Sequence, residues 1–142
     1  MKRYAAAFVP GGFDMFHIGH LTILRHATSI ADRVIAGVVD DETLHVMKNR
    51  CPVVGLRDRM EIVGSIGIVD EVAVLGSTSK VDAWNRLGFD VLVKGDDWQH
   101  TPKGDALERE MRAVGVDVAY FPYTPGTSST VLRDRLRVRT AS

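Results

Sequence analysis

The sequence predicts an α/β fold, in which a parallel sheet of about five strands is covered by helices on both faces. Short apolar, β-branched runs alternate with stretches whose apolar residues recur at helical spacing. The run at residues 34–39 is continuously apolar, which is typical of a strand buried on both faces. Strict alternation of this kind predicts parallel strands joined by helices. At 142 residues, the chain is expected to form a single domain spanning residues 1–142.

In the first half of the chain, the sequence predicts two strands and two helices in addition to the strand at residues 34–39. Residues 4–9 are an apolar run closed by a Pro-Gly-Gly sequence, so a strand is expected there. Residues 19–31 and 56–66 carry apolar side chains at helical spacing. Residues 40–54 are polar and contain a proline, so we expect a loop or a broken helix. A short apolar run predicts a strand at residues 72–75.

The second half continues the alternation. Residues 81–87 predict a short helix, and residues 91–93 a buried strand followed by the sequence KGDDW. A helix is expected from Thr101 or Pro102 to about residue 114, because a hydroxyl and a proline suit a helix start. The last strand is expected at residues 116–121. A closing helix is expected from Ser129 to about residue 137, with the hydroxyl as its cap.

Composition excludes several classes of function. Eighteen Lys and Arg balance eighteen Asp and Glu, which argues against broad nucleic-acid or membrane binding. The single cysteine, Cys51, excludes an internal disulfide and a cysteine-rich zinc site. No apolar run approaches the ~20 residues needed to span a bilayer. The basic and apolar start of the chain is too short for a signal peptide and leads directly into a glycine turn, so a cytoplasmic location is expected.

Three polar segments each follow a predicted strand: GGFDMFHIGH, KGDDW and TPGTSST. The carboxyl ends of parallel strands share one edge, where ligands bind at a switch in strand order. We therefore expect one pocket. His17 and His20 are three residues apart at a helix start, where they could donate to a phosphate beside the free N–H groups. Two histidines at this spacing, without further signals, more often share no function. The strand before them and the adjacent glycines favour a binding site.

GGFDMFHIGH resembles the signature of the HxGH-motif nucleotidyltransferase superfamily, and TPGTSST resembles the second signature of its cytidylyltransferase branch. KGDDW is similar to the same stretch of glycerol-3-phosphate cytidylyltransferases. The resemblance implies a Rossmann-like domain, often a homodimer, that transfers CMP from CTP to a small phosphate- or phosphonate-bearing acceptor and releases pyrophosphate. Glycerol 3-phosphate is the first candidate acceptor. Magnesium would be bound through the triphosphate, since Mg²⁺ prefers phosphate oxygens and few protein ligands.

The resemblance also implies roles for particular residues. The catalytic set would be His17, His20 and Lys48. The nucleotide-binding set would be Gly11, Gly12, Phe13, Asp14, Arg59, Asp96, Gly126, Ser128, Ser129 and Thr130. Asp41, Trp98 and Tyr123 would lie near the acceptor. Lys94 is interpreted as a strand-end surface residue, and Arg133 as part of the solvent face of the last helix, from which it could reach a phosphate.

Two departures from the branch pattern keep alternatives open. Tyr123 stands where the branch has arginine, and Gly12 stands where threonine is common. Tyrosine cannot replace the charge of a bidentate arginine on phosphate. Heptose-phosphate adenylyltransferases resemble the same pattern without that arginine, so ATP and a sugar phosphate remain possible, as does a phosphonate-specific enzyme. From other classes, a metal-dependent hydrolase would use Asp14, His17 and His20 as ligands, and a nucleotide sensor would bind without turnover.

Overall fold

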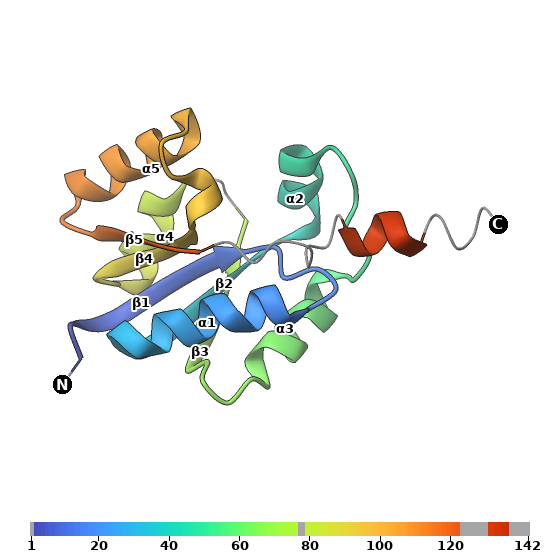
Figure 1. Ribbon diagram of the computed structural model, residues 1–142, viewed down its shortest axis with the longest axis horizontal. Helices are drawn as coiled ribbons and strands as arrows, with labels where there is room; N and C mark the ends of the chain where they lie inside the picture. The colour runs from blue at the N-terminus through green and yellow to red at the C-terminus, as the bar shows by residue number, and fades with distance from the viewer. Residues whose placement is uncertain (1, 77–78, 123–130, 137–142) are drawn as a thin grey trace.

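Five parallel strands form one sheet in the order β3-β2-β1-β4-β5 in the computed structural model, which describes residues 2–76, 79–122 and 131–136 (Figure 1). The strands are β1 (Tyr4–Gly11), β2 (Ala31–Val39), β3 (Glu71–Leu75), β4 (Val91–Gly95) and β5 (Asp117–Phe121). The helices are α1 (Ile18–Ile30), α2 (Asp41–Lys48), α3 (Leu56–Gly64), α4 (Lys80–Leu87) and α5 (Pro102–Ala113), and residues 131–136 are also helical. The predicted α/β class and parallel sheet are confirmed.

One region is more regular than its sequence predicted. Residues 40–54, expected as a loop or a broken helix, contain the helix α2. The carboxylate of Asp40 accepts from the N–H of Thr43 at 2.8 Å and caps its start. The helix ends at Asn49, which has a φ of 55°. The apolar signal was weak because only Leu44 of this helix is buried.

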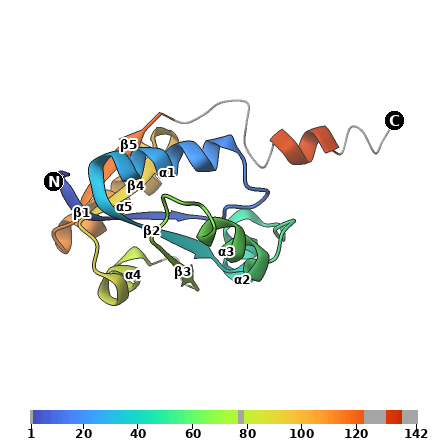
Figure 2. The ribbon, with the colours of Figure 1, turned by 90° about the horizontal axis from the view of Figure 1, so that it is seen from below.

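Two hydrophobic cores lie on the two faces of the sheet. Alternate residues of β1 illustrate this, since Phe8 belongs to the core under α4 and α5 whereas Ala7 and Val9 belong to the core under α1 and α3. The ribbon shows α1 and α3 on one side of the sheet and α2, α4 and α5 on the other (Figures 1 and 2). Within the described part of the chain, no helix is long and apolar enough to cross a membrane.

The strand order reverses between β1 and β4. From β1 the chain moves outward to β2 and β3, then returns through α4 to β4 on the other side of β1. Ala7 pairs with Val91 and Phe8 with Leu92 across this junction. The carboxyl ends of β1 and β4 therefore flank the crevice where parallel sheets bind ligands.

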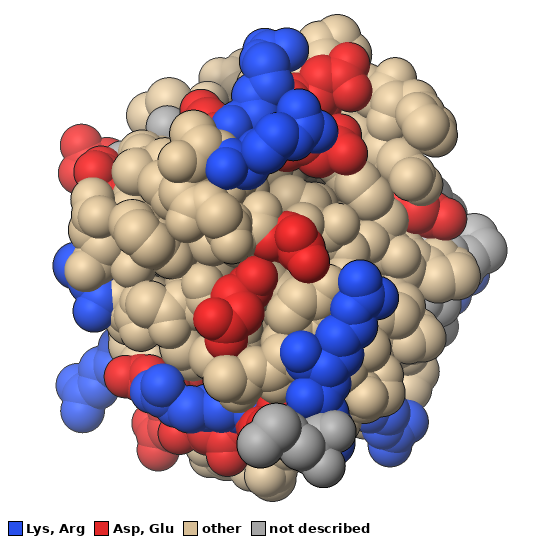
Figure 3. Space-filling model, turned by 90° about the vertical axis from the view of Figure 1, so that its left-hand side faces the viewer, with Lys and Arg blue, Asp and Glu red and all other residues tan. Residues whose placement is uncertain are grey.

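The opposite end of the sheet, where the strands begin, carries charges of both signs. Figure 3 shows this face, on which Lys and Arg side chains alternate with Asp and Glu in small groups. Arg33 and Glu71 form one such exposed ion pair. Mixed charge of this kind provides no extended basic surface at this end of the molecule.

Gly37 in the middle of β2 allows the ring of Phe8 to fill the core. A Cβ atom on Gly37 would lie 2.4 Å from Cζ of Phe8, whose ring stacks on Phe89 with centroids 4.6 Å apart. We predict that Gly37→Ala lowers the free energy of unfolding by about 1–3 kcal/mol, because the buried ring must move. Urea denaturation measures this. Gly67→Ala is the control, since its Cβ meets nothing within 4 Å; equal losses in both variants would contradict the packing argument.

Candidate active site

A pocket of about 560 Å³ lies at the carboxyl ends of β1 and β4. Its wall includes the predicted glycine turn, with Gly11, Gly12 and Phe13, and the start of α1. The charged and ionisable side chains that line it are Asp14, His17, His20, Lys48, Arg50, Lys94, Asp97 and Arg133. The volume is ample for a nucleotide-sized ligand. Two of the three polar segments therefore meet, as their positions after strands predicted.

Two histidines cap the start of α1. Nδ1 of His17 accepts from the N–H of Gly19 at 3.0 Å, and Nδ1 of His20 accepts from the N–H of His17 at 3.2 Å. An imidazole that accepts at Nδ1 carries its proton on Nε2. Each ring is thus held as the Nε2–H tautomer, and the backbone of the helix start selects that tautomer.

Both histidines are held in the neutral form. The pKa of His20 is lowered to about 3, mainly by burial and in part by the neighbouring His17, while Asp14 opposes the shift. Burial also lowers the pKa of His17. The two rings stack with centroids 3.9 Å apart, an arrangement that two imidazolium ions would oppose. At neutral pH the pocket therefore has two N–H donors here and no imidazolium charge.

Asp14 fixes the turn that leads into α1. Its carboxylate accepts from the N–H groups of Val53 and Val54, both at 2.8 Å, and pairs with Arg133 from the helical residues 131–136. Phe13 and Met15, on either side, have φ values of 53° and 50°. Non-glycine residues adopt this left-handed region only where the surroundings enforce it. Asp14, expected among the nucleotide-binding residues, therefore lines the pocket and also holds the turn in place.

Arg59 does not reach the pocket, contrary to its expected role as a nucleotide ligand. Its side chain is 1% exposed, and Nη1 donates to the carbonyls of Gly12 at 2.6 Å and Val39 at 2.8 Å. Nε donates to the carbonyl of Val54 at 2.8 Å. Nη2 pairs at 2.5 Å with Asp41, which also does not line the pocket although it was expected near the acceptor. The protein's own carbonyl groups and the carboxylate of Asp41 thus satisfy the cation at this helix start.

Three basic side chains from two regions of the chain line the pocket. Lys48 lies at the end of α2, Arg50 lies just beyond it, and Arg133 belongs to the helical residues 131–136. Arg133 was expected mainly on a solvent face, and here it brings a guanidinium to the site. There its guanidinium pairs with the carboxylate of Asp14.

The segment after β4 differs in detail from the prediction. Asp97 lines the pocket, whereas the predicted Asp96 does not. Both lie in a single 3₁₀ turn, Asp96–Trp98, whose geometry could not be read from two adjacent aspartates. Trp98, which was expected near the acceptor, lines the pocket.

Lys94 is a further site residue that the sequence analysis missed. It was interpreted as a surface residue, but it lines the pocket and its Nζ lies 4.0 Å from the centroid of the Trp98 ring. A signal was present in the sequence, since Lys94 directly precedes the glycine at the end of a buried strand. Tyr123, Gly126, Ser128, Ser129 and Thr130 lie outside the described residues.

The hydrolase alternative is not supported by the donors available. Among the described residues, no group of three His, Cys, Asp or Glu side chains is placed to hold a metal ion. Nδ1 of His17 and of His20 already accept backbone N–H groups, and the carboxylate of Asp14 accepts two more. These groups act in folding the turn and are not arranged as metal ligands.

We predict that Arg59→Met lowers the free energy of unfolding by about 2–4 kcal/mol, because buried carbonyl groups lose their donor. Chemical denaturation measures the loss, and Arg57→Met is the control, since Arg57 is exposed on the same helix. Equal losses in Arg59→Met and Arg57→Met would contradict the structural role of the buried guanidinium.

Comparison with known proteins identifies the family. The model of the cytidylyltransferase-like family matches residues 8–135. FAD synthase of Pyrococcus horikoshii is 34% identical over 125 residues, covering 85% of this chain and 82% of that protein. Ethanolamine-phosphate cytidylyltransferase of Dictyostelium discoideum is 40% identical over 93 residues, covering 63% of this chain. The chain spans 26% of the length of that enzyme and of the bifunctional protein HldE of Koribacter versatilis, to which it is 29% identical.

The fold is shared with solved structures at lower identity. The lipopolysaccharide core biosynthesis protein of Thermoplasma volcanium superposes with a TM-score of 0.71 at 16% identity, covering 85% of this chain and 97% of that one. Its likeness concerns the fold alone. The family match includes the second half of β1, the histidine-capped α1 and the segment after β4. The chain therefore belongs to the cytidylyltransferase-like family of the nucleotidyltransferase superfamily.

Proposed function

We propose that this protein transfers CMP from CTP to a small acceptor bearing a phosphate or phosphonate group, with release of pyrophosphate. The observation that carries the proposal is the pair of neutral Nε2–H donors at the start of α1, in a pocket with several basic side chains. Such a pocket suits a polyanion, and its donors suit the charge that develops on a phosphoryl group during transfer. The similarity to ethanolamine-phosphate cytidylyltransferase supports CTP as the nucleotide.

In the proposed reaction, an oxygen of the acceptor attacks the α-phosphorus of CTP while the bond to the β-phosphate breaks, and pyrophosphate leaves. His17 and His20 donate to the phosphate oxygens without giving up a proton, because both are neutral donors. Lys48, Arg50 and Arg133 neutralise the triphosphate. Glycine at positions 11 and 12 allows the backbone of the turn to approach the ligand closely. No covalent intermediate on the protein is needed.

Magnesium fits this arrangement as a partner of the triphosphate. Asp97 presents a carboxylate on the pocket wall, whereas the carboxylate of Asp14 is engaged by the protein. A Mg²⁺ ion would therefore be held mainly by phosphate oxygens, with Asp97 as the protein residue placed to contact it or its water. When bound, the ion would supply charge neutralisation at the phosphates.

Adenylyl transfer to a sugar phosphate is the second candidate. It is favoured by the similarity to FAD synthase, whose product contains an adenosine unit, and by Tyr123 in place of the branch arginine. The pocket residues that hold phosphates do not discriminate between bases. Proposals of a homodimer and of a cytoplasmic location rest on the family resemblance and the composition.

A screen of pyrophosphate release tests the two candidates. We expect release with CTP and Mg²⁺ and one acceptor among glycerol 3-phosphate, phosphoethanolamine, phosphocholine and small phosphonates. Release with ATP and heptose 1-phosphate only would support the second candidate. No release with any pair, although CTP binds, would contradict transfer and support a nucleotide sensor.

We predict that His17→Asn lowers kcat by roughly 10²–10³ while the fold keeps its stability, because asparagine caps a helix but lacks the Nε2–H donor. His17→Ala should lose turnover and also about 0.5–2 kcal/mol of unfolding free energy, since the cap is lost. Pyrophosphate release and urea denaturation measure the two effects separately. Full turnover in His17→Asn would rule out the proposed role of this ring.

A further inference from the structure

Lys94 lies in an environment with an excess of positive charge. Four lysines influence one another here: Lys94 at the end of β4, Lys80 on α4, Lys48 on α2 and Lys103 on α5. Asp97 is the carboxylate that favours the charged form of Lys94, and Glu110 favours that of Lys80. Among the described residues, Lys94 forms no ion pair. A half-buried ammonium with like charges around it is costly unless an anion is bound nearby.

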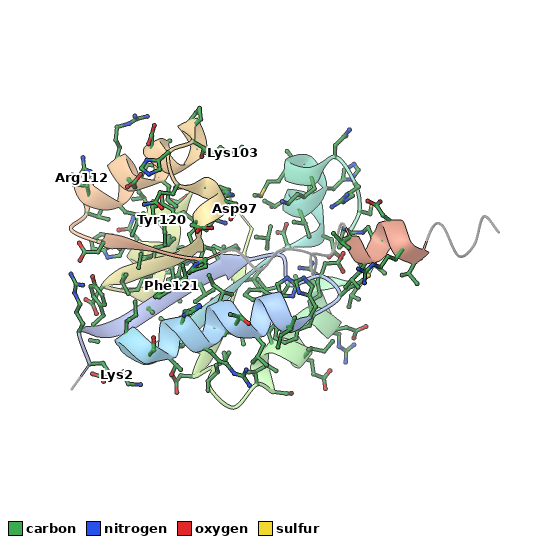
Figure 4. The ribbon with its side chains drawn as sticks, in the orientation of Figure 1. Lys2, Asp97, Lys103, Arg112, Tyr120 and Phe121 are labelled. Carbon is green, nitrogen blue, oxygen red and sulfur yellow. The ribbon has the colours of Figure 1, made fainter. Side chains whose placement is uncertain are left out.

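The pKa of Lys94 reflects both its burial and this excess of positive charge. Burial is the main cause that lowers its pKa to about 8; Lys80, Lys48 and Lys103 also lower it, and Asp97 raises it. Its Nζ also contacts the face of Trp98, a platform that Lys103 approaches at 5.8 Å. In Figure 4, Asp97 and Lys103 lie in the layer above the sheet, at the end toward which the strand arrows point.

Lys94 and the two histidines approach the pocket from opposite faces of the sheet. On β4, Leu92 belongs to the core under α4 and α5, so Lys94, two residues later, shares that face. His20 lies against Phe13, with ring centroids 5.4 Å apart, and Phe13 belongs to the core under α1. Both groups of donors line the same pocket, whose wall also includes the glycine turn after β1. This edge of the sheet could therefore hold two anions, one near Lys94 and one near the histidines.

Transfer of a nucleotidyl group requires two anions to meet, with the attacking and leaving oxygens roughly in line. We propose that Lys94 binds the phosphate or phosphonate group of the acceptor, opposite the histidine-capped start of α1. This inference rests on the proposed function. The triphosphate already has His17, His20 and the basic residues near them, whereas the acceptor needs a cation of its own to offset its repulsion by CTP.

The test compares Lys94→Met and Lys94→Arg with the native protein, using CTP and glycerol 3-phosphate or the best acceptor of the screen. We expect Lys94→Met to raise the acceptor KM roughly 10- to 100-fold and the CTP KM less than threefold, because one charge-assisted contact is lost. Arg112→Met is the control, since Arg112 is exposed at the far end of α5 (Figure 4). A rise in the CTP KM that exceeds the rise in the acceptor KM would overturn the assignment. So would an unchanged KM for both substrates.

The pH dependence separates contact from a structural role. Lys94 loses its charge as the pH rises through about 8, so the native acceptor KM should rise between pH 8 and 9.5. A phosphate monoester keeps its full charge in this range, since its second pKa is about 6. Arginine stays charged, so the acceptor KM of Lys94→Arg should not change over this pH range. A Lys94→Arg profile that still rises as the native one does would overturn the proposal.

A binding measurement keeps the inference separable from the proposed function. The ¹³Cε shift of Lys94 should titrate near pH 8 in the free protein and at higher pH with inorganic phosphate, because a bound anion stabilises the ammonium. Phosphate affinity should fall in Lys94→Gln, a variant available if Lys94→Met does not fold. If no acceptor reacts, the proposed function fails, and an unmoved ¹³Cε titration with phosphate would separately overturn the anion site.

Discussion

The guanidinium of Arg59 is the interaction on which the site depends. It joins the turn after β1, the end of β2 and the segment before α3 through the carbonyls of Gly12, Val39 and Val54. The carboxylate of Asp14 ties the same turn to the same segment from the other side. Between them, they hold a backbone with two non-glycine residues in the left-handed region, a conformation that costs of order 1–3 kcal/mol for each residue. The histidine donors begin directly after this turn, so their positions depend on it.

The neutral histidines follow from the same local structure. A helix start offers free N–H groups, and here two of them are satisfied by imidazole nitrogens rather than by hydroxyl or carboxylate oxygens. This use of Nδ1 leaves Nε2–H as the outward donor, and burial, with the neighbouring His17, lowers the pKa of His20 and keeps its ring neutral. The zero net charge of the chain therefore conceals a local pattern. Positive charge in the pocket comes from lysine and arginine, while the histidines contribute hydrogen bonds.

The sequence predicted the parallel fold and the convergence of the first and second polar segments, because strand alternation and glycine turns depend on local patterns. It did not distinguish Arg59, which is buried, from a ligand arginine, because both uses place a cation at a helix start. Lys94 was misinterpreted because its environment, with the Trp98 ring beside it and lysines from three other elements around it, forms only in the fold. The choice between Asp96 and Asp97 depended on one 3₁₀ turn. In each case the deciding contacts come from residues distant in the sequence or from backbone geometry.

The two groups of donors also differ in how they respond to pH. His20 stays neutral across the physiological range, since its pKa of about 3 lies far below it, whereas Lys94, with a pKa of about 8, is close to changing its charge. Any loss of function at alkaline pH through this pocket would therefore start at the β4 side, while the α1 side remained unchanged. An anion bound near Lys94 would raise its pKa and retain the proton. Occupancy and charge at this end of the pocket thus reinforce each other, which gives the empty and occupied sites different electrostatics without a change of fold.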